Sequence, residues 1–360
     1  MTEHILIVGG GILGASVAYA LSQKNVQVTL LEQHEVAAGA TSKSFGWINA
    51  NFSETKDYFA LRMAAIAAYR ELPEEVSRTA DLQWGGSIWW EDEGAELQSH
   101  FAYLQSLGYP SKVIDRTEIS ALETHLASPP DRAIHGLEEA SVDTSALTTA
   151  LLRKAAQNGV RVLLGASVSE ILFQNGVANG LRTSVGDQMA DRIVLTAGAG
   201  CNRFLESLGQ PSWVEEKQGL VVKTSPTNRL IQHLILSPDV HFRQGADGRF
   251  LVGEIFSGDG ANAGRMKIDP VGLAEEVLAR FKVRLPAAEA VDIDALLLGK
   301  RPVPKDGLPV VGTLEQAPNV YLAATHSGIT LGPFLGQLIA DELTGNGASP
   351  FLAPFRPREF

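Results

Sequence analysis

The hydrophobic pattern of the chain opens with an uncharged stretch, residues 5–22, in which three consecutive glycines interrupt the apolar residues. A membrane span needs about 20 apolar residues without a break, and glycine is unfavourable in a helix centre. The apolar residues before the glycines therefore predict a short buried strand, and the alanine- and leucine-rich segment after them predicts a helix. Residues 26–31 predict a second strand that ends at Glu32. An export signal carries positive charge before its apolar run, whereas this chain has Glu3 there. The whole pattern therefore indicates a strand–turn–helix–strand unit.

The glycines of this unit follow the pattern Gly9-x-Gly11-x-x-Gly14, and Glu32 lies 18 residues after the last of them. Gly9 permits a tight turn, Gly11 lets a pyrophosphate approach the backbone, and Gly14 lets the helix pack closely on the strand. The helix N-terminus favours phosphate, and the acid can accept hydrogen bonds from ribose hydroxyls. A ligand-free glycine turn leaves the acid unexplained. The predicted nucleotide contacts are Gly9, Gly11, Ile12, Leu13, Gly14, Glu32 and Gln33.

The remaining pattern alternates helices and strands. The expected helices cover residues 58–72, about 93–107, about 271–281 and a last one from about Gly332, and the expected strands include 86–90, 320–324 and most of 217–300. Residues 141–168 predict a capped helix followed by a strand, and residues 191–209 predict a strand followed by a glycine-rich turn and a helix. Composition adds limits to this picture. With 360 residues and 45% hydrophobic residues the chain can form two domains. The net charge of −11, without a basic patch, argues against nucleic acid. The single Cys201 excludes an internal disulfide and suits the cytoplasm, and no Cys/His spacing predicts a metal site.

Five further motifs lie outside the first unit: "GATS" at 39–42, "LTAGAG" at 195–200, "FRQGADGRFLVGE" at 242–254, "GKRPVPKDGLPVVG" at 299–312 and "THSGITLGPFLGQLIADEL" at 325–343. With these motifs the chain resembles the D-amino acid oxidase/glycine oxidase/sarcosine oxidase (DAO) family of FAD enzymes over essentially its whole length. The resemblance implies an α/β plus α+β fold with two domains. A Rossmann-like FAD domain of the glutathione-reductase type would comprise residues 1–75, 140–215 and 300–360, and a mixed-sheet substrate domain would comprise residues 76–139 and 216–299.

The resemblance also implies FAD contacts outside the first unit, at Thr41, Ser42, Lys43, Ser44, Gly46, Val168, Ala197, Gly198, Gly307, Gly328, Ile329 and Thr330. A helix N-terminus after Gly328 could stabilise negative charge on a reduced flavin, although an ordinary strand–helix connection is the alternative. Lys43 could equally be a solvated lysine. Sarcosine oxidases attach FAD through a cysteine in the C-terminal half; Cys201 lies elsewhere, so FAD is expected to be noncovalent. The tryptophans at 84, 89 and 90 could line a pocket, but core positions are favoured.

Three residues are candidates for the substrate site by resemblance. Arg301 matches the arginine that holds the substrate carboxylate in glycine oxidases, and a planar guanidinium suits a carboxylate; a structural ion pair is the alternative. His241 stands where a tyrosine reinforces that grip, and a second arginine of glycine oxidases is absent near Gly328. His326 is shared with the family and is either catalytic or structural.

The implied reaction is oxidation of a D-amino acid, glycine, sarcosine or iminodiacid by hydride transfer to flavin N5, followed by hydrolysis of the imine. Electrons would pass to oxygen or to a quinone or protein carrier, since no second nucleotide motif suggests NAD(P)H. Oxidation of a 2-hydroxy acid, a tRNA-modifying step and a role as the FAD subunit of a larger dehydrogenase remain alternatives. We expect a cytoplasmic location, peripheral to the membrane if a quinone is the acceptor, no transmembrane segment, and a monomer or homo-oligomer.

Overall fold

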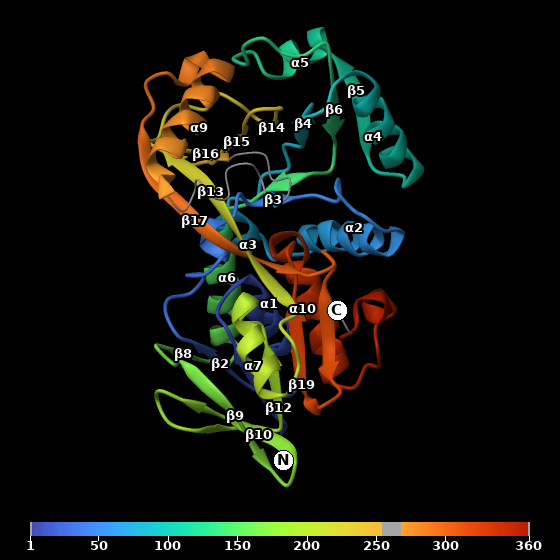
Figure 1. The fold of residues 1–360 in the computed structure, drawn as a ribbon, viewed down its shortest axis with the longest axis vertical. Helices are drawn as coiled ribbons and strands as arrows, with labels where there is room; N and C mark the ends of the chain where they lie inside the picture. Colours follow the sequence, from blue (N-terminus) through green and yellow to red (C-terminus); the bar gives the residue numbers. More distant parts are fainter. Residues whose placement is uncertain (1, 254–267, 359–360) are drawn as a thin grey trace.

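The computed structural model describes residues 2–253 and 268–358 and shows an elongated molecule built on two large sheets (Figure 1). The sheet nearer the N-terminus has six strands in the order β18-β19-β12-β1-β2-β8. Its strands are parallel except for β18. Their bounds are β1 His4–Val8, β2 Gln27–Glu32, β8 Arg161–Leu164, β12 Arg192–Leu195, β18 Val310–Leu314 and β19 Ala317–Ala324.

Strand β1 is buried on both faces, which explains its unbroken apolar sequence. Ile5 and Ile7 belong to a core shared with the helices α1 (Ile12–Leu21), α6 (Thr144–Gln157) and α10 (Gly328–Leu343). Leu6 and Val8 belong to a second core, shared with α7 (Cys201–Ser207) and a three-stranded sheet. That small sheet comprises β9 Val168–Gln174, β10 Val177–Thr183 and β11 Gln188–Met189.

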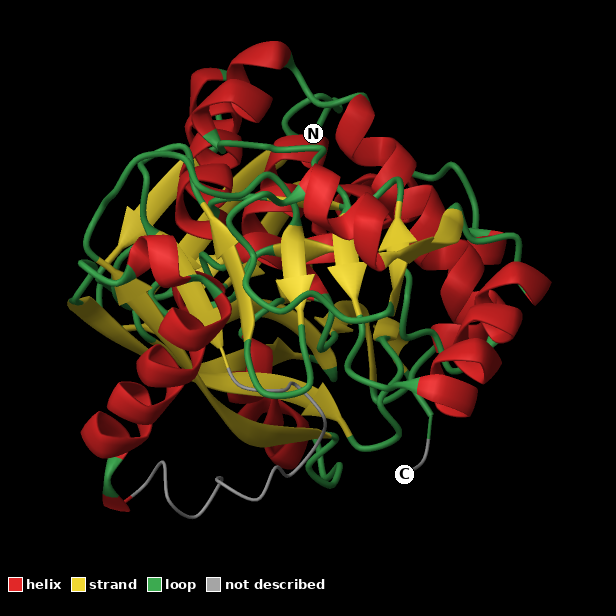
Figure 2. Ribbon diagram, turned by 90° about the horizontal axis from the view of Figure 1, so that it is seen from above, coloured by secondary structure: helices red, strands yellow, loops and turns green. Residues whose placement is uncertain are grey.

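The second large sheet has eight strands in the order β17-β13-β16-β15-β14-β4-β6-β5 and lies at the end of the molecule opposite the N-terminus in Figure 1. Figure 2 looks along the long axis from above and shows the strands in yellow and the helices in red. Helix α9 (Pro270–Arg284) covers it through Phe281, whose ring centroid lies 5.1 Å from that of Phe242 and 4.8 Å from that of Phe250. The strand bounds are β4 Ser87–Trp89, β5 Ser111–Asp115, β6 Arg132–Gly136, β13 Val214–Thr224, β14 Leu234–Leu236, β15 His241–Gln244, β16 Phe250–Gly253 and β17 Ile293–Pro304. The neighbouring helices are α4 Gly94–Ser106 and α5 Arg116–Leu122.

Between the large sheets lies the loop that contains Phe45. It is held by a short two-stranded sheet, β3 (Trp47–Ile48) with β7 (Ala140–Ser141), and by helices α2 (Lys56–Arg70) and α3 (Glu74–Thr79). Arg243 on β15 is 4% exposed. It donates from Nε to the Phe45 carbonyl at 2.5 Å and from Nη2 to the Val142 carbonyl at 2.8 Å. Burial lowers the pKa of this guanidinium to about 10, so Arg243 remains charged near neutral pH while it links the eight-stranded sheet to the loop.

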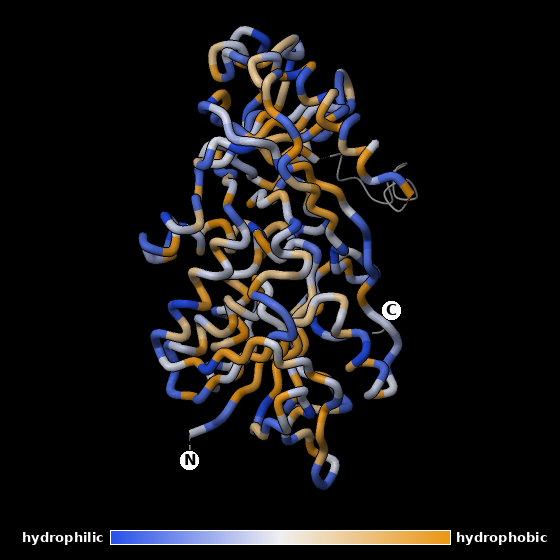
Figure 3. The backbone as a smooth tube through the Cα atoms, turned by 90° about the vertical axis from the view of Figure 1, so that its left-hand side faces the viewer, coloured by the Kyte–Doolittle hydropathy of each residue, from blue (hydrophilic) through white to orange (hydrophobic). Residues whose placement is uncertain are grey.

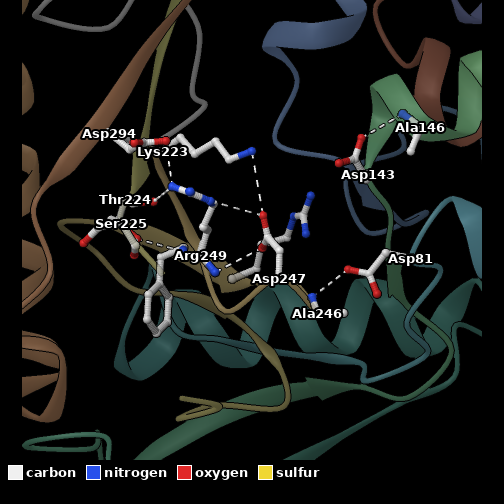
Figure 4. A network of polar contacts seen from close by, with 12 residues as sticks. Asp81, Asp143, Ala146, Lys223, Thr224, Ser225, Ala246, Asp247, Arg249 and Asp294 are labelled. Atoms are coloured by element: carbon white, nitrogen blue, oxygen red, sulfur yellow. Dashed lines mark hydrogen bonds and ion pairs between the residues drawn. The ribbon is translucent and has the colours of Figure 1, made fainter. Parts of the chain in front are cut away.

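A surface network braces the β15–β16 turn (Figure 4). Arg249 lies 2.6 Å from Asp294 and 3.6 Å from Asp247, while the backbone N–H of Ala246 donates to Asp81 at 2.8 Å. These charges are partly exposed, and exposed pairs contribute little stability individually. Figure 3 shows the apolar segments, in orange, running through the interior. Within the described ranges, no helix combines the length and apolarity that a membrane crossing requires.

The secondary structure agrees with most expected elements, with one correction. Helix α10 begins at Gly328, about one turn before the expected start near Gly332. Strand β17 continues to Pro304 and so crosses the expected domain boundary at residue 300; the domain ranges remain a proposal. Trp89 and Trp90 are buried in the core, as the favoured interpretation holds. Glu254, the last residue of the "FRQGADGRFLVGE" motif, lies outside the described residues.

Candidate active site

A cavity of about 890 Å³ runs along both large sheets and collects most of the predicted residues. This volume is at the upper end of the range for ligand sites, roughly 300–1,000 Å³. One end is lined by Glu32, Gln33 and His34, and the other walls include Phe52 and Glu91. The cavity is therefore lined both by residues of the first strand–helix unit and by residues of the eight-stranded sheet.

The glycine turn shows the tight packing expected of its three positions. Gly9 has a φ of +107°, and a side chain there would meet the Thr196 carbonyl oxygen at 2.8 Å. A Cβ on Gly14 would collide with the Gly9 carbonyl oxygen and lie 2.9 Å from Thr196 Oγ1. A Cβ on Gly11 would meet only Thr41 Oγ1, at 3.2 Å. Gly11 lines the cavity together with Gly9, Ile12 and Leu13. Backbone at Gly11 is thus open to a ligand, whereas Gly14 serves helix packing.

Glu32 lies where β2 ends and reaches back over the glycine turn. Its Oε2 accepts a hydrogen bond from the Gly10 N–H at 2.6 Å, and its Oε1 accepts one from the His34 N–H at 2.8 Å. A carboxylate offers about four acceptor positions. Glu32 can therefore brace the turn and still accept hydrogen bonds from hydroxyl groups in the cavity.

Helices α1 and α10 run in parallel and present both N-termini to the cavity. Their contact depends on small residues: a Cβ on Gly332 would lie 2.8 Å from Ile12 Cγ1, and one on Gly336 would lie 2.5 Å from the Ser16 carbonyl oxygen. Gly328, Ile329 and Thr330 form the first turn of α10 and line the cavity. First-turn N–H groups have no acceptor within their helix, so the two N-termini supply two sites that favour negative charge.

The loop at 41–46 forms another wall. Thr41, Lys43, Ser44 and Gly46 line the cavity, whereas Ser42 turns toward the Gly39 carbonyl, 3.5 Å from its Oγ. Gly46 has a φ of +77°, and a Cβ there would lie 2.8 Å from Arg243 Nη2. Lys43 packs on β17, because a Cβ on Gly299 would lie 2.8 Å from Lys43 Cβ. The other predicted contacts that line the cavity are Val168, Ala197, Gly198 and Gly307.

Arg301 extends from β17 into this cavity and is half-buried. It is paired in register with Lys217 of β13, and its Nη2 donates to the Gln218 carbonyl at 3.2 Å. His326 lines the same cavity. Desolvation by the surrounding protein, together with the charges of Arg301, Arg62 and Lys217, lowers the pKa of His326 to about 4. The site therefore combines an uncharged imidazole with a concentration of positive charge.

His241 has a different environment from Arg301. Its side chain is 1% exposed, and its Nε2 lies 2.7 Å from Oε1 of Glu91, whose side chain is 17% exposed. Of these two, Glu91 is the one that lines the cavity. The expectation that His241 reinforces the grip on a carboxylate stays a prediction, and the structure gives this imidazole a carboxylate partner of its own.

Several cavity residues were not anticipated, notably Tyr58, Arg62, Glu91 and Lys217. Arg62 is buried and donates to the Asn49 carbonyl at 2.9 Å. It could have been found, because it lies on the same helical face as the buried residues Tyr58, Leu61, Ala65, Ile66 and Tyr69. A charged residue on an apolar face indicates a buried polar role. Glu91 and Lys217 had no comparable local signal.

These features fit FAD. The glycine turn leaves room for a pyrophosphate beside a helix N-terminus, Glu32 lines the cavity with acceptor capacity for ribose hydroxyls, and the first turn of α10 offers N–H donors that a flavin could use. Cys201 is fully buried in the second core, where desolvation raises its pKa to about 12. A thiol in that environment is poorly suited to covalent attachment.

Comparisons with known proteins support this assignment. The family model for FAD dependent oxidoreductases (DAO) matches residues 4–342. Glycine oxidase of Geobacillus kaustophilus is 26% identical over 363 residues, which cover 98% of this chain and 95% of that protein. Its crystal structure has a TM-score of 0.86 over 100% of both chains at 25% identity. The crystal structure of iminodiacetate oxidase from Chelativorans sp. BNC1 has a TM-score of 0.84 over 98% of both chains, also at 25% identity.

Proposed function

The chain belongs to the FAD-dependent oxidoreductase (DAO) family, and on that basis we propose that it oxidises the carbon–nitrogen bond of a small amino acid or N-substituted glycine. FAD dependence and action on CH–NH donors are properties of the family. The relatives named for glycine and iminodiacetate support a substrate that carries both an amine and a carboxylate. This substrate class also matches the charge of the cavity around Arg301.

In this proposal Arg301 binds the substrate carboxylate through two parallel hydrogen bonds. Its position on a long strand, next to Lys217, gives the guanidinium a fixed base in a positively charged wall. Gly219 and Gly299 are paired in the register beside it, and their lack of side chains leaves room for the side chains of Arg301 and Lys43. Orientation of the substrate is the main contribution that these residues make to the rate.

The bound FAD supplies the redox chemistry by accepting two electrons with the hydride that leaves the substrate carbon. The amine must be uncharged to form the carbon–nitrogen double bond, so its proton leaves to solvent, and water then hydrolyses the imine to a carbonyl product and an amine or ammonia. His326 remains uncharged near neutral pH and so adds no further repulsion toward a protonated amine as it enters. The α10 N-terminus favours the negative charge that accompanies reduction.

Oxygen or an electron carrier re-oxidises the protein in this proposal. A cytoplasmic location, membrane contact if the carrier is a quinone, and homo-oligomer formation rest on the sequence-based expectations alone.

The observation that carries the proposal is the presence of Arg301 in the same cavity as the nucleotide-binding turn. An anaerobic screen tests it: the purified yellow protein is mixed with glycine, sarcosine, iminodiacetate, both enantiomers of the common amino acids and the corresponding 2-hydroxy acids, and flavin absorbance is followed. Bleaching by an amino acid supports the proposal. Bleaching only by 2-hydroxy acids points to that other chemistry, and no bleaching by any of these compounds favours a subunit role.

A further inference from the structure

The pair formed by Glu91 and His241 places a carboxylate on the wall of the cavity, at a position for which the proposed reaction gives no role. Glu91 follows β4, and its Oε1 lies 2.7 Å from Nε2 of the buried His241. The two atoms lie at ion-pair distance, and Glu91 itself lines the cavity. An ionised carboxylate has several acceptor positions and no donor. Such a group selects a ligand that donates hydrogen bonds or carries positive charge.

The strand register separates this pair from Arg301. In the strand register His241 is paired with Gly253, Gly253 with Val221, and Val221 with Leu297. Arg301 lies four residues farther along β17 and therefore on the same face. Three strand spacings correspond to roughly 14 Å and four residues along a strand to roughly 13 Å. The Cα atoms of His241 and Arg301 are therefore about 20 Å apart. Arg301 and Glu91 therefore mark two distant parts of one cavity.

The surroundings of the two groups have opposite charge. Burial lowers the pKa of His100, while the nearby carboxylates of Asp92 and Glu91 act against that shift. Around His326, the cations of Arg301, Arg62 and Lys217 act in addition to its burial, and Arg62 also donates to the Phe52 carbonyl at 2.9 Å. The charge distribution therefore suits a ligand with an anionic and a cationic end.

Aromatic rings form the wall near Glu91. Phe52 is 44% exposed and lines the cavity together with Trp47, with ring centroids 5.9 Å apart. Trp89, two residues before Glu91, lies behind Phe52 at 6.2 Å. Rings beside a carboxylate suit an alkyl chain that ends in an ammonium or guanidinium group, because the chain packs on the rings and the cation meets their faces.

We propose that Glu91, positioned by His241, is a specificity-determining residue that binds the cationic side-chain end of a basic α-amino acid. This inference rests on the proposed function, in which the α-carboxylate of the same substrate binds Arg301. The substrate class is thus an amino acid such as ornithine, lysine or arginine, and His241 is a positioning residue.

Binding of non-oxidisable ligands tests the inference without turnover. Isothermal titration of the FAD-loaded protein compares hexanoate with 6-aminohexanoate, and 4-aminobutyrate and 5-aminopentanoate vary the length. The parent should prefer the amino form by roughly 10–100-fold, as expected for a charge-assisted hydrogen bond. Glu91→Gln should abolish that preference and leave hexanoate binding unchanged. Glu93→Gln, an exposed acid two residues farther along the chain, is the matched control and should keep it. His241→Leu should reduce the preference, and His241→Gln, which retains a donor, should restore part of it.

The rates of flavin bleaching by lysine and by norleucine then distinguish a failure of the Glu91 inference from a failure of the proposed function. The inference predicts that Glu91→Gln slows reduction by lysine roughly 10–100-fold and leaves norleucine unaffected. An equal loss with both substrates would mean that Glu91 acts on the α-amine, and unchanged rates with both would mean that it has no substrate role; either result overturns the inference. If Arg301→Ala leaves hexanoate binding unchanged, the proposed function itself is wrong at the carboxylate, whatever Glu91 does.

Discussion

Replacement of Glu32 separates the bracing of the glycine turn, which the structure shows, from the ribose contact that we propose for the same carboxylate. In the structure it accepts the Gly10 N–H at 2.6 Å and the His34 N–H at 2.8 Å, and it lines the cavity, where we propose that it accepts hydrogen bonds from the adenosine ribose. Gly10 is buried, whereas His34 is exposed. Glu32→Ala removes the acceptor from both N–H groups, but water can replace it only at His34.

The two losses have comparable size. A buried N–H left without a partner costs about 1–3 kcal/mol, so Glu32→Ala should lower the free energy of unfolding of the FAD-free protein by that amount. Loss of a charged acceptor for the ribose hydroxyls should weaken FAD binding by about 1–3 kcal/mol, which corresponds to roughly 5–150-fold in Kd. Glu32→Gln keeps one acceptor oxygen and should give a smaller loss in both quantities.

Urea unfolding followed by tryptophan fluorescence measures the first quantity, and titration of the FAD-free protein with FAD measures the second. Glu35→Gln is the control, because Glu35 is an exposed acid three residues farther along the chain. A loss of stability with an unchanged FAD Kd would show that Glu32 braces the turn without facing the ribose. Parental values for both quantities in Glu32→Ala would refute the reasoning altogether.

Other consequences can be measured independently. Acid or denaturant should release FAD from the polypeptide because Cys201 is buried in a core; flavin that precipitates with the protein would contradict this. Arg243→Met should lower the free energy of unfolding by about 2–5 kcal/mol in urea titrations, since the carbonyls of Phe45 and Val142 each lose a donor; an unchanged midpoint would argue against these bonds. His326 has its pKa lowered to about 4, so its imidazole stays neutral until the pH falls toward that value. The ratio of kcat/KM for the parent and His326→Gln should then be constant between about pH 5.5 and about pH 8; a limb near the ordinary histidine pKa, about 6.5, that disappears in the variant would disprove it.

Local chemistry explains which features the sequence could predict. The first strand–helix unit follows from an apolar run, three glycines and one acid, all within about one βαβ unit. The start of α10 was placed too late because Gly328, Gly332, Pro333 and Gly336 are weak helix formers. In the structure these glycines allow close contact with α1, and that tertiary packing overrides their low intrinsic propensity.

The substrate part of the site depends on pairings between distant segments. Glu91 meets His241 because β4 and β15 both pair with β14, although about 150 residues separate the two in sequence. The hydrophobic pattern of a sequence does not predict which distant strands pair. Arg301 is predicted only by the family motif, and the position of Lys217 beside it follows from the register of β13 with β17.

Steady-state kinetics of Arg301 variants test the central claim most directly, which is that an amino acid substrate is held by its carboxylate beside the flavin. With whichever amino acid bleaches the flavin, Arg301→Ala should cost about 2–5 kcal/mol in kcat/KM, because the carboxylate loses its partner. Arg301→Lys keeps the charge but not the two parallel hydrogen bonds and should raise KM and lower kcat. The corresponding amine without a carboxylate is the control and should react equally with all three proteins, whose flavin spectra should match. If both variants keep the parental KM and kcat for the amino acid, Arg301 is structural and the account of the substrate site is wrong.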